Sequence, residues 1–139
     1  MKPRGLTMNH RGRLIRKAFE AFLDAKAYYK ECYRLYDAIQ YKRNNVKGVN
    51  YEPKVPGTGS GETKALLYDR EMQTVSAELY RLQLYLDWIN TLLDEFDTDD
   101  EAFIRERYIE GMQLETIAEA HGLTREGVKY KYEQIFRNL

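Results

Sequence analysis

The sequence predicts an all-α protein: a long antiparallel helical hairpin, coiled-coil-like, followed by a C-terminal pair of short helices. Apolar residues recur at helical spacing over two long stretches, and a segment rich in Gly and Pro separates these stretches. With 139 residues, 43% hydrophobic and 32% charged, the composition is typical of a folded domain in water. We expect a basic N-terminal arm at 1–10, the hairpin at 11–96 with a flexible loop at 44–61, and a C-terminal module at 97–139.

The first helix is predicted from Arg11 to about Lys42, because its apolar residues recur at steps of three and four. These residues are Ile15, Ala18, Phe19, Phe22, Ala25, Tyr29, Cys32, Tyr33, Tyr36 and Ile39. The tyrosines of this stretch lie among lysines and arginines, which is compatible with base stacking on nucleic acid. Three of them lie on the apolar stripe, so packing in a core or an interface is the favoured interpretation. Cys32 is the only cysteine and is expected to be a small core residue.

The second helix is predicted from Glu62 to Glu95, where a four-three alternation of apolar residues is typical of a coiled-coil seam. Seven seam positions are predicted to mediate oligomerisation: Met72, Val75, Leu79, Leu82, Leu86, Ile89 and Leu93. Further apolar residues lie off the seam, among them Leu66, Leu84 and Trp88. A stripe wider than a two-helix seam needs more cover. We therefore expect either self-association, with a dimer favoured, or docking of the C-terminal module.

The acidic segment 94–101 precedes a short helix predicted at Asp99–Glu110. Carboxylates of this density could bind a divalent cation, but Thr98 and Glu101 have capping-box spacing and acids favour the first turn of a helix. A helix start is the preferred interpretation, and no metal is expected. The segment GTGSGETK lacks the spacing of a phosphate-binding loop, so no cofactor is expected either. No nucleophile and base are spaced in the sequence as in a known catalytic arrangement, and the protein is not expected to be an enzyme.

The last 29 residues, GMQLETIAEAHGLTREGVKYKYEQIFRNL, predict two short helices that cross at a tight turn. Gln113 and Thr124 stand at cap positions, Gly122 stands at the turn, and the small Ala118 suits a helix crossing. This pattern indicates a helix-turn-helix. The exposed side of its second helix is the predicted DNA-binding surface, formed by Thr124, Arg125, Glu126, Lys129, Tyr130, Gln134 and Arg137.

This C-terminal segment resembles region four of bacterial sigma factors, whose helix-turn-helix reads promoter DNA in the major groove. The resemblance implies that Arg125, Glu126 and Lys129 touch bases or phosphates, while Tyr130 replaces a polar base reader, often Gln. It also implies contact with bacterial RNA polymerase. It covers about 40 of the 139 residues, and no segment resembles the promoter-melting region of a complete sigma factor.

The order of the predicted elements is similar to that of the RinA and ArpU families of phage late-gene regulators. The resemblance implies a DNA-binding transcription regulator of phage late genes in the cytoplasm of a bacterial host. Two alternatives stay open: a DNA-recognition subunit of a packaging machine, of the small-terminase type, and a coiled-coil protein-binding adaptor. No apolar run approaches the roughly 20 residues that span a bilayer, so no membrane partner is expected.

The charge is zero overall but unevenly distributed. Residues Met1–Lys47 carry 12 Lys and Arg against 4 Asp and Glu, a surplus of 8 positive charges. The acidic middle follows, and Thr124–Leu139 carries 4 against 2, a surplus of 2. Such a distribution fits nucleic-acid contact at the basic ends, and it fits equally an attraction between parts of the molecule.

Overall fold

The structure, a computed structural model, describes residues 6–46 and 61–139. All elements in these ranges are helices, which confirms the all-α prediction. None of the helices in the described ranges has the length and apolar character needed to cross a membrane. The chain divides into two compact units: unit 1 consists of Met1–Ala25 and Tyr85–Leu139, and unit 2 consists of Lys26–Leu84.

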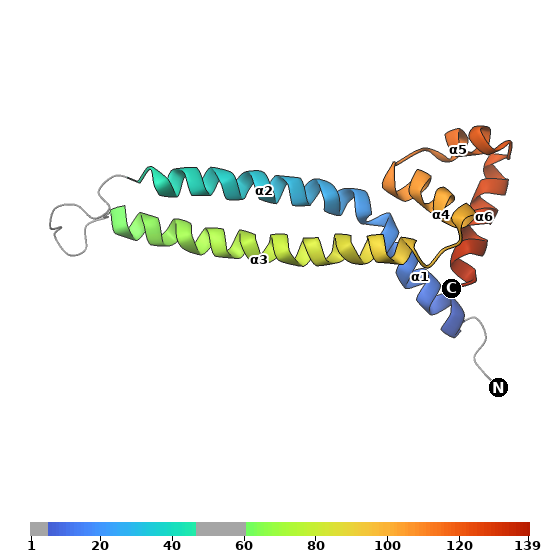
Figure 1. Cartoon of the computed structure of the whole chain (residues 1–139), viewed down its shortest axis with the longest axis horizontal. Coiled ribbons are helices and arrows are strands. Elements are labelled where there is room, and N and C mark those ends of the chain that lie inside the picture. Colours follow the sequence, from blue (N-terminus) through green and yellow to red (C-terminus); the bar gives the residue numbers. More distant parts are fainter. Residues whose placement is uncertain (1–5, 47–60) are drawn as a thin grey trace. The chain divides into compact units, whose positions relative to one another are not determined.

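The first predicted helix is two helices, α1 (Leu6–Glu20) and α2 (Phe22–Asn44), which meet at Ala21 (Figure 1). Helix α1 begins within the predicted N-terminal arm rather than at Arg11. Phe19 and Phe22 lie on either side of the break, and both are buried in unit 1. The break has no Gly or Pro that would mark it in the sequence. It accompanies tertiary packing, which apolar periodicity does not encode.

Unit 2 consists of the antiparallel parts of α2 and α3 (Gly61–Leu93), which lie side by side (Figure 1). The Arg43 guanidinium pairs with Asp69 at 2.9 Å, and the Tyr28 hydroxyl donates to Glu78 at 3.5 Å. Buried residues between the helices are Cys32, Ile39, Ala65 and Leu82. Cys32 is therefore a core residue, as predicted. Helix α2 ends at Asn44 and α3 begins at Gly61, and residues 47–60 of the predicted loop at 44–61 lie outside the described residues.

Unit 1 contains α4 (Thr98–Ile104), the π-helix η1 (Arg105–Ile109), α5 (Leu114–His121) and α6 (Arg125–Arg137), together with α1 and the end of α3. One hydrophobic core joins these elements. Its centre is the fully buried Phe19 of α1, whose ring lies 6.0 Å from Phe96, 6.0 Å from Tyr108 and 6.3 Å from Phe136. An aromatic side chain of α1 thus contacts three aromatic rings of the C-terminal core.

The residues of this core come from both sides of the predicted domain boundary between residues 96 and 97. Ile15, Phe19 and Phe22 enter it from the N-terminal side, and Ile89, Leu92 and Leu93 enter it from α3. A unit as small as the C-terminal helices buries only a modest fraction of its surface when it folds by itself. Side chains from other segments therefore enlarge its core. Residues 97–139 therefore share their core with two segments that the sequence assigned to the hairpin.

Candidate nucleic-acid interface

Helices α5 and α6 are joined by a tight turn whose local sequence explains its geometry. Gly122 adopts the left-handed conformation, with φ 69°, that glycine tolerates best. The Leu123 amide donates to the Ala118 carbonyl at 2.8 Å, which closes the end of α5. Thr124 then caps α6, and its hydroxyl accepts a hydrogen bond from the Gly127 amide at 3.0 Å. The predicted roles of Gly122 and Thr124 are confirmed.

The angle between α5 and α6 is held by buried side chains. Ile117 and Ala118 of α5 belong to the same core as Val128 and Tyr132 of α6, and all four are buried. The Tyr132 hydroxyl donates to the Phe103 carbonyl at 2.6 Å, which ties α6 to α4. Burial raises the pKa of Tyr132 far above its ordinary value of 10.0. These contacts fix one side of α6 and leave the opposite side to solvent.

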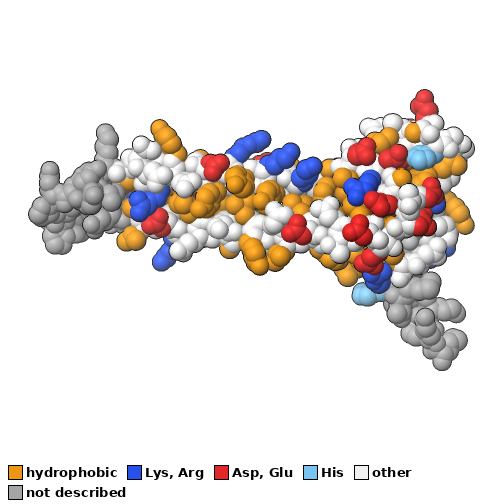
Figure 2. Space-filling view, viewed as in Figure 1, with side chains coloured by type: hydrophobic (Ala, Val, Ile, Leu, Met, Phe, Trp, Pro, Cys, Tyr) orange, Lys and Arg blue, Asp and Glu red, His pale blue; other side chains and the backbone are white. Residues whose placement is uncertain are grey.

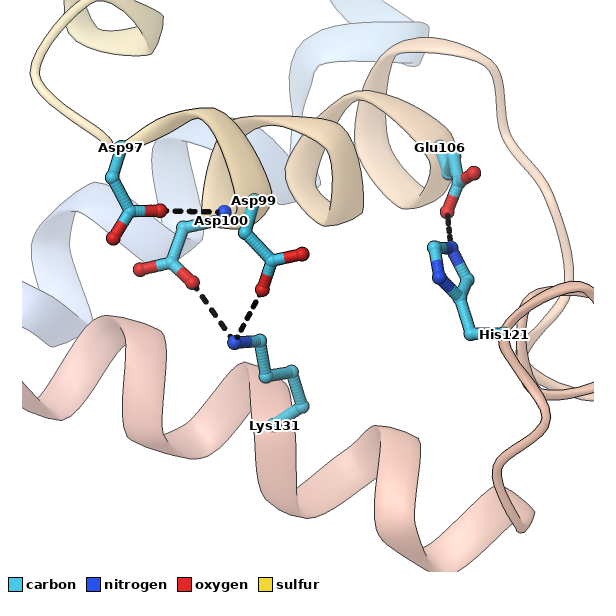
Figure 3. A network of polar contacts seen from close by, with 6 residues as sticks. All are labelled: Asp97, Asp99, Asp100, Glu106, His121 and Lys131. Atoms are coloured by element: carbon cyan, nitrogen blue, oxygen red, sulfur yellow. Dashed lines mark hydrogen bonds and ion pairs between the residues drawn. The ribbon is translucent and has the colours of Figure 1, made fainter.

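Polar contacts connect the same helices at the edge of the core (Figure 3). The Asp97 carboxylate accepts from the Asp100 amide at 2.9 Å and caps α4, so the cap lies one residue before the predicted Thr98. Lys131 of α6 lies 3.1 Å from both Asp99 and Asp100. The acidic segment thus starts a helix and holds α6. Among the described residues, no three His, Cys, Asp or Glu side chains are arranged to hold a metal ion.

His121 makes a contact that its sequence position did not indicate. Its Nε2 lies 2.7 Å from a carboxylate oxygen of Glu106, and its ring stacks on Phe103 with centroids 4.3 Å apart. The contact joins the end of α5 to η1 and α4. Residues 15 positions apart in the chain meet here, a distance at which sequence spacing carries no helical signal.

The structure places the predicted DNA-binding residues on or beside the outward face of α6. All are exposed except Gln134, which is half-buried: Thr124, Arg125, Glu126, Lys129, Tyr130, Gln134 and Arg137. Tyr130, which is 63% exposed, lies opposite the buried Val128 and Tyr132. Lys129 and Arg137 lie toward the edge that α1 covers.

Helix α6 carries a surplus of two positive charges, and carboxylates within it and beside it pair with its cations. Arg125 pairs with Glu115 at 3.1 Å, Lys129 with Glu126 at 3.8 Å and Arg137 with Glu133 at 4.0 Å. The hydrogen bonds that Lys131 donates to the Asp100 and Asp99 carboxylates raise the pKa of Lys131. These pairs are mostly solvent-exposed, so each contributes at most about 1 kcal/mol and a phosphate can compete for the cation.

Helix α1 lies directly against α6, which sequence reasoning missed. Gly12 is buried, and a Cβ atom there would lie 2.0 Å from the Phe136 carbonyl oxygen. Only glycine permits this approach of α1 to the α6 backbone. A lone glycine inside a helical pattern is the sequence signal that could have indicated the contact. The approach brings Arg13 and Arg16 next to Arg137.

The predicted oligomerisation residues are covered to different degrees within their own chain. Leu82, Ile89 and Leu93 are buried, and the other four are half-buried: Met72, Val75, Leu79 and Leu86. The exposed apolar residues of α3 in unit 2 lie off the seam and include Leu66, Tyr80 and Leu84, which are 68%, 68% and 52% exposed. Figure 2 shows hydrophobic side chains at the surface of the two long helices. The seam residues are thus fully or partly covered within the chain, whereas these off-seam residues are largely exposed.

Protein-family models, curated proteins and solved structures were each compared with the chain, and none of them matches.

Proposed function

We propose that this protein is a sequence-specific, double-stranded-DNA-binding transcription regulator, and that α5 and α6 act as its helix-turn-helix. The observation that carries the proposal is the exposed row of polar and charged side chains along α6, opposite the side that the core fixes. In this class of DNA-binding motif, the second helix enters the major groove and its N-terminal residues contact base edges. Arg125, Glu126 and Lys129 lie in that part of α6.

The side chains suit the chemistry of base and phosphate recognition. Arg125 can bond a guanine through two hydrogen bonds, and Glu126 can accept one from cytosine. Lys129 can pair with a phosphate, and Tyr130 presents an exposed aromatic ring with a hydroxyl. On binding, Arg125 would exchange Glu115 for the base. Since this ion pair is more than half exposed on both sides, it opposes the exchange only weakly.

We also propose that the chain self-associates, with a dimer favoured, through the outward side of α3 in unit 2. Leu66, Tyr80 and Leu84 support this assignment, because removing large, exposed apolar side chains from water stabilises a complex with the partner that covers them. Two linked reading heads bind a two-part site far more tightly than one. This gain would compensate for the small positive charge of α6.

The resemblance to sigma factors leads us to propose, in addition, a contact with host RNA polymerase at phage late promoters. Its test requires the full chain, because a fragment 97–139 would lose the α1 and α3 side chains of the unit 1 core. We expect tagged full-length protein to co-purify with polymerase from the bacterial host. Failure to do so, together with stimulation of a large terminase, would favour the packaging alternative.

The second candidate function is a protein-binding adaptor. It is favoured by one observation: within the described residues, each cation of α6 already has an acidic partner within 4.0 Å. An adaptor would use the exposed apolar side of α3 and would bind DNA no better than any weakly charged protein of its size.

Mutations on a site selected from random DNA distinguish the two functions. Arg125→Ala should weaken binding to the selected duplex by about 1–3 kcal/mol and relax the preference at one base pair. Lys129→Ala should weaken binding to every duplex and flatten the salt dependence. Arg34→Ala, on exposed α2 in unit 2, is the control and should have neither effect. Unchanged anisotropy titrations for both α6 variants would favour the adaptor.

A further inference from the structure

The boundary between α1 and α6 contains a group of positive side chains in unit 1. Two adjoining grooves, of about 430 and 300 Å³, share Arg16 and Glu133 in their walls. Their cations are Arg13, Arg16, Arg107, Lys129 and Arg137, and their carboxylates are Glu20 and Glu133. Five cations against two carboxylates leave a surplus of three positive charges.

Of the cations that α1 and η1 supply to these grooves, Arg13 and Arg107 differ from those of α6 because they make no ion pair with a described residue. Arg13 is exposed and makes no ion pair with any described residue. Arg107 donates to the Met112 carbonyl at 3.0 Å and likewise has no acidic partner among the described residues. Arg16 lies 3.7 Å from Glu20 and 5.7 Å from the centre of the Phe136 ring, which holds its side chain beside α6. Arg13 and Arg107 therefore add unpaired positive charge beside α6.

The grooves also adjoin the proposed reading surface. Lys129 lines the larger groove and Arg137 the smaller one, and both border the outward face of α6. The close approach of Gly12 to Phe136 sets the separation of α1 from α6. A molecule lying along the outward face of α6 would meet Arg13 and Arg16 at its edge.

We propose that the α1–α6 grooves bind phosphate oxygens of the DNA backbone that flanks the bases facing α6, with Arg13 and Arg16 as the main donors. This inference rests on the proposed DNA-binding function and names α1 as a second contributor to it. Guanidinium groups match phosphate geometry with two parallel hydrogen bonds. Phosphate contacts position a protein on DNA without reading its sequence. In this assignment, α6 reads the bases and α1 supplies most of the counterion release.

The test measures binding of the full chain to the selected duplex and to a scrambled duplex by anisotropy, between 50 and 200 mM salt. Arg13→Gln should flatten the slope of log affinity against log salt by about 0.9, which is roughly a 3.5-fold smaller loss of affinity over this range. Arg13→Gln combined with Arg16→Gln should flatten it by about twice as much. Both variants should weaken the two duplexes by the same factor. Arg34→Gln, with the same change of charge in unit 2, should leave the slope unchanged.

The outcomes separate this inference from the proposed function. If the wild-type chain prefers no duplex, the proposed function fails and the α1 assignment fails with it. If the wild type binds its site and Arg125→Ala weakens it, but the Arg13 and Arg16 variants keep the wild-type slope and circular dichroism melt, only the α1 assignment is overturned. A loss confined to the selected duplex would overturn it too, because that result indicates base reading. Inorganic phosphate that displaces DNA at constant ionic strength would indicate a small-anion site instead.

Discussion

Replacing Gly12 with alanine should destabilise unit 1, because the new Cβ would meet backbone rather than a side chain that can turn away. The Cβ would lie 2.0 Å from the Phe136 carbonyl oxygen and 3.0 Å from its carbon. Ordinary carbon–oxygen contacts are about 3.3 Å or longer, so α1 must move away from α6 by roughly an ångström. Overpacking of this kind costs about 1–3 kcal/mol, and a backbone obstacle favours the upper end. Alanine returns about 1 kcal/mol of helix propensity, which leaves a net loss of about 2 kcal/mol.

Urea denaturation followed by fluorescence measures this loss, because the single tryptophan, Trp88, lies in unit 1. A loss of 2 kcal/mol should lower the midpoint by about 1 M urea. The matched control is Gly127→Ala in α6, where the new Cβ would meet only the Thr124 hydroxyl at 3.2 Å and the Leu123 Cβ at 3.9 Å. The control should change the free energy of unfolding by less than about 1 kcal/mol. A midpoint for Gly12→Ala equal to or above that of the wild type would refute the close packing of α1 on α6.

Three further predictions concern stability and assembly. Burial raises the pKa of Tyr108 and Tyr132 above 10.0. Above this pH the folded state therefore keeps protons that the unfolded chain loses. The free energy of unfolding should fall as pH rises above about 10, by up to about 1.4 kcal/mol per pH unit for each group. Urea titrations from pH 8 to 11 should show this decline, with a shallower one for Tyr132→Phe, and a flat profile would contradict it. Leu84→Lys should lower the mass measured by light scattering, while the circular dichroism spectrum stays helical. Leu82→Asp should instead reduce helicity, since Leu82 is buried within its own chain. Equal effects of the two variants would argue against the exposed side of α3 as the interface. Lys131→Met should lower the free energy of unfolding by up to about 1 kcal/mol at low salt and by less at 1 M salt, and a loss that is independent of salt would rule out the ion pairs with the acidic segment.

Local sequence signals predicted the helices of this protein well. Apolar periodicity predicted the second long helix at Glu62–Glu95, and α3 spans Gly61–Leu93. Gly122 and Thr124 placed the turn between α5 and α6, because a left-handed residue and a hydroxyl cap act within a few positions of the chain. Cys32, expected to be a core residue, and Ala118, expected at the helix crossing, are both buried.

The features that the sequence did not predict arise from contacts between helices that are distant in the chain. The break at Ala21 and the burial of Phe19 among C-terminal aromatic rings arise from contacts between distant segments. The predicted boundary at residue 97 differs from the observed units for the same reason. At the candidate interface, the exposed residues of α6 were foreseen, while the contribution of Arg13 depends on the approach of Gly12 to Phe136.

The most direct test of the central claim is the specificity of the wild-type chain for DNA. The full chain is used to select duplexes from random DNA, and its affinity for the enriched sequence and for a scrambled duplex is measured by anisotropy at the same salt concentration. We expect one sequence to be enriched and to be bound at least about 10³-fold more tightly than the scrambled duplex. Equal affinities, or no enrichment, would contradict the assignment of α5 and α6 as a DNA-reading pair.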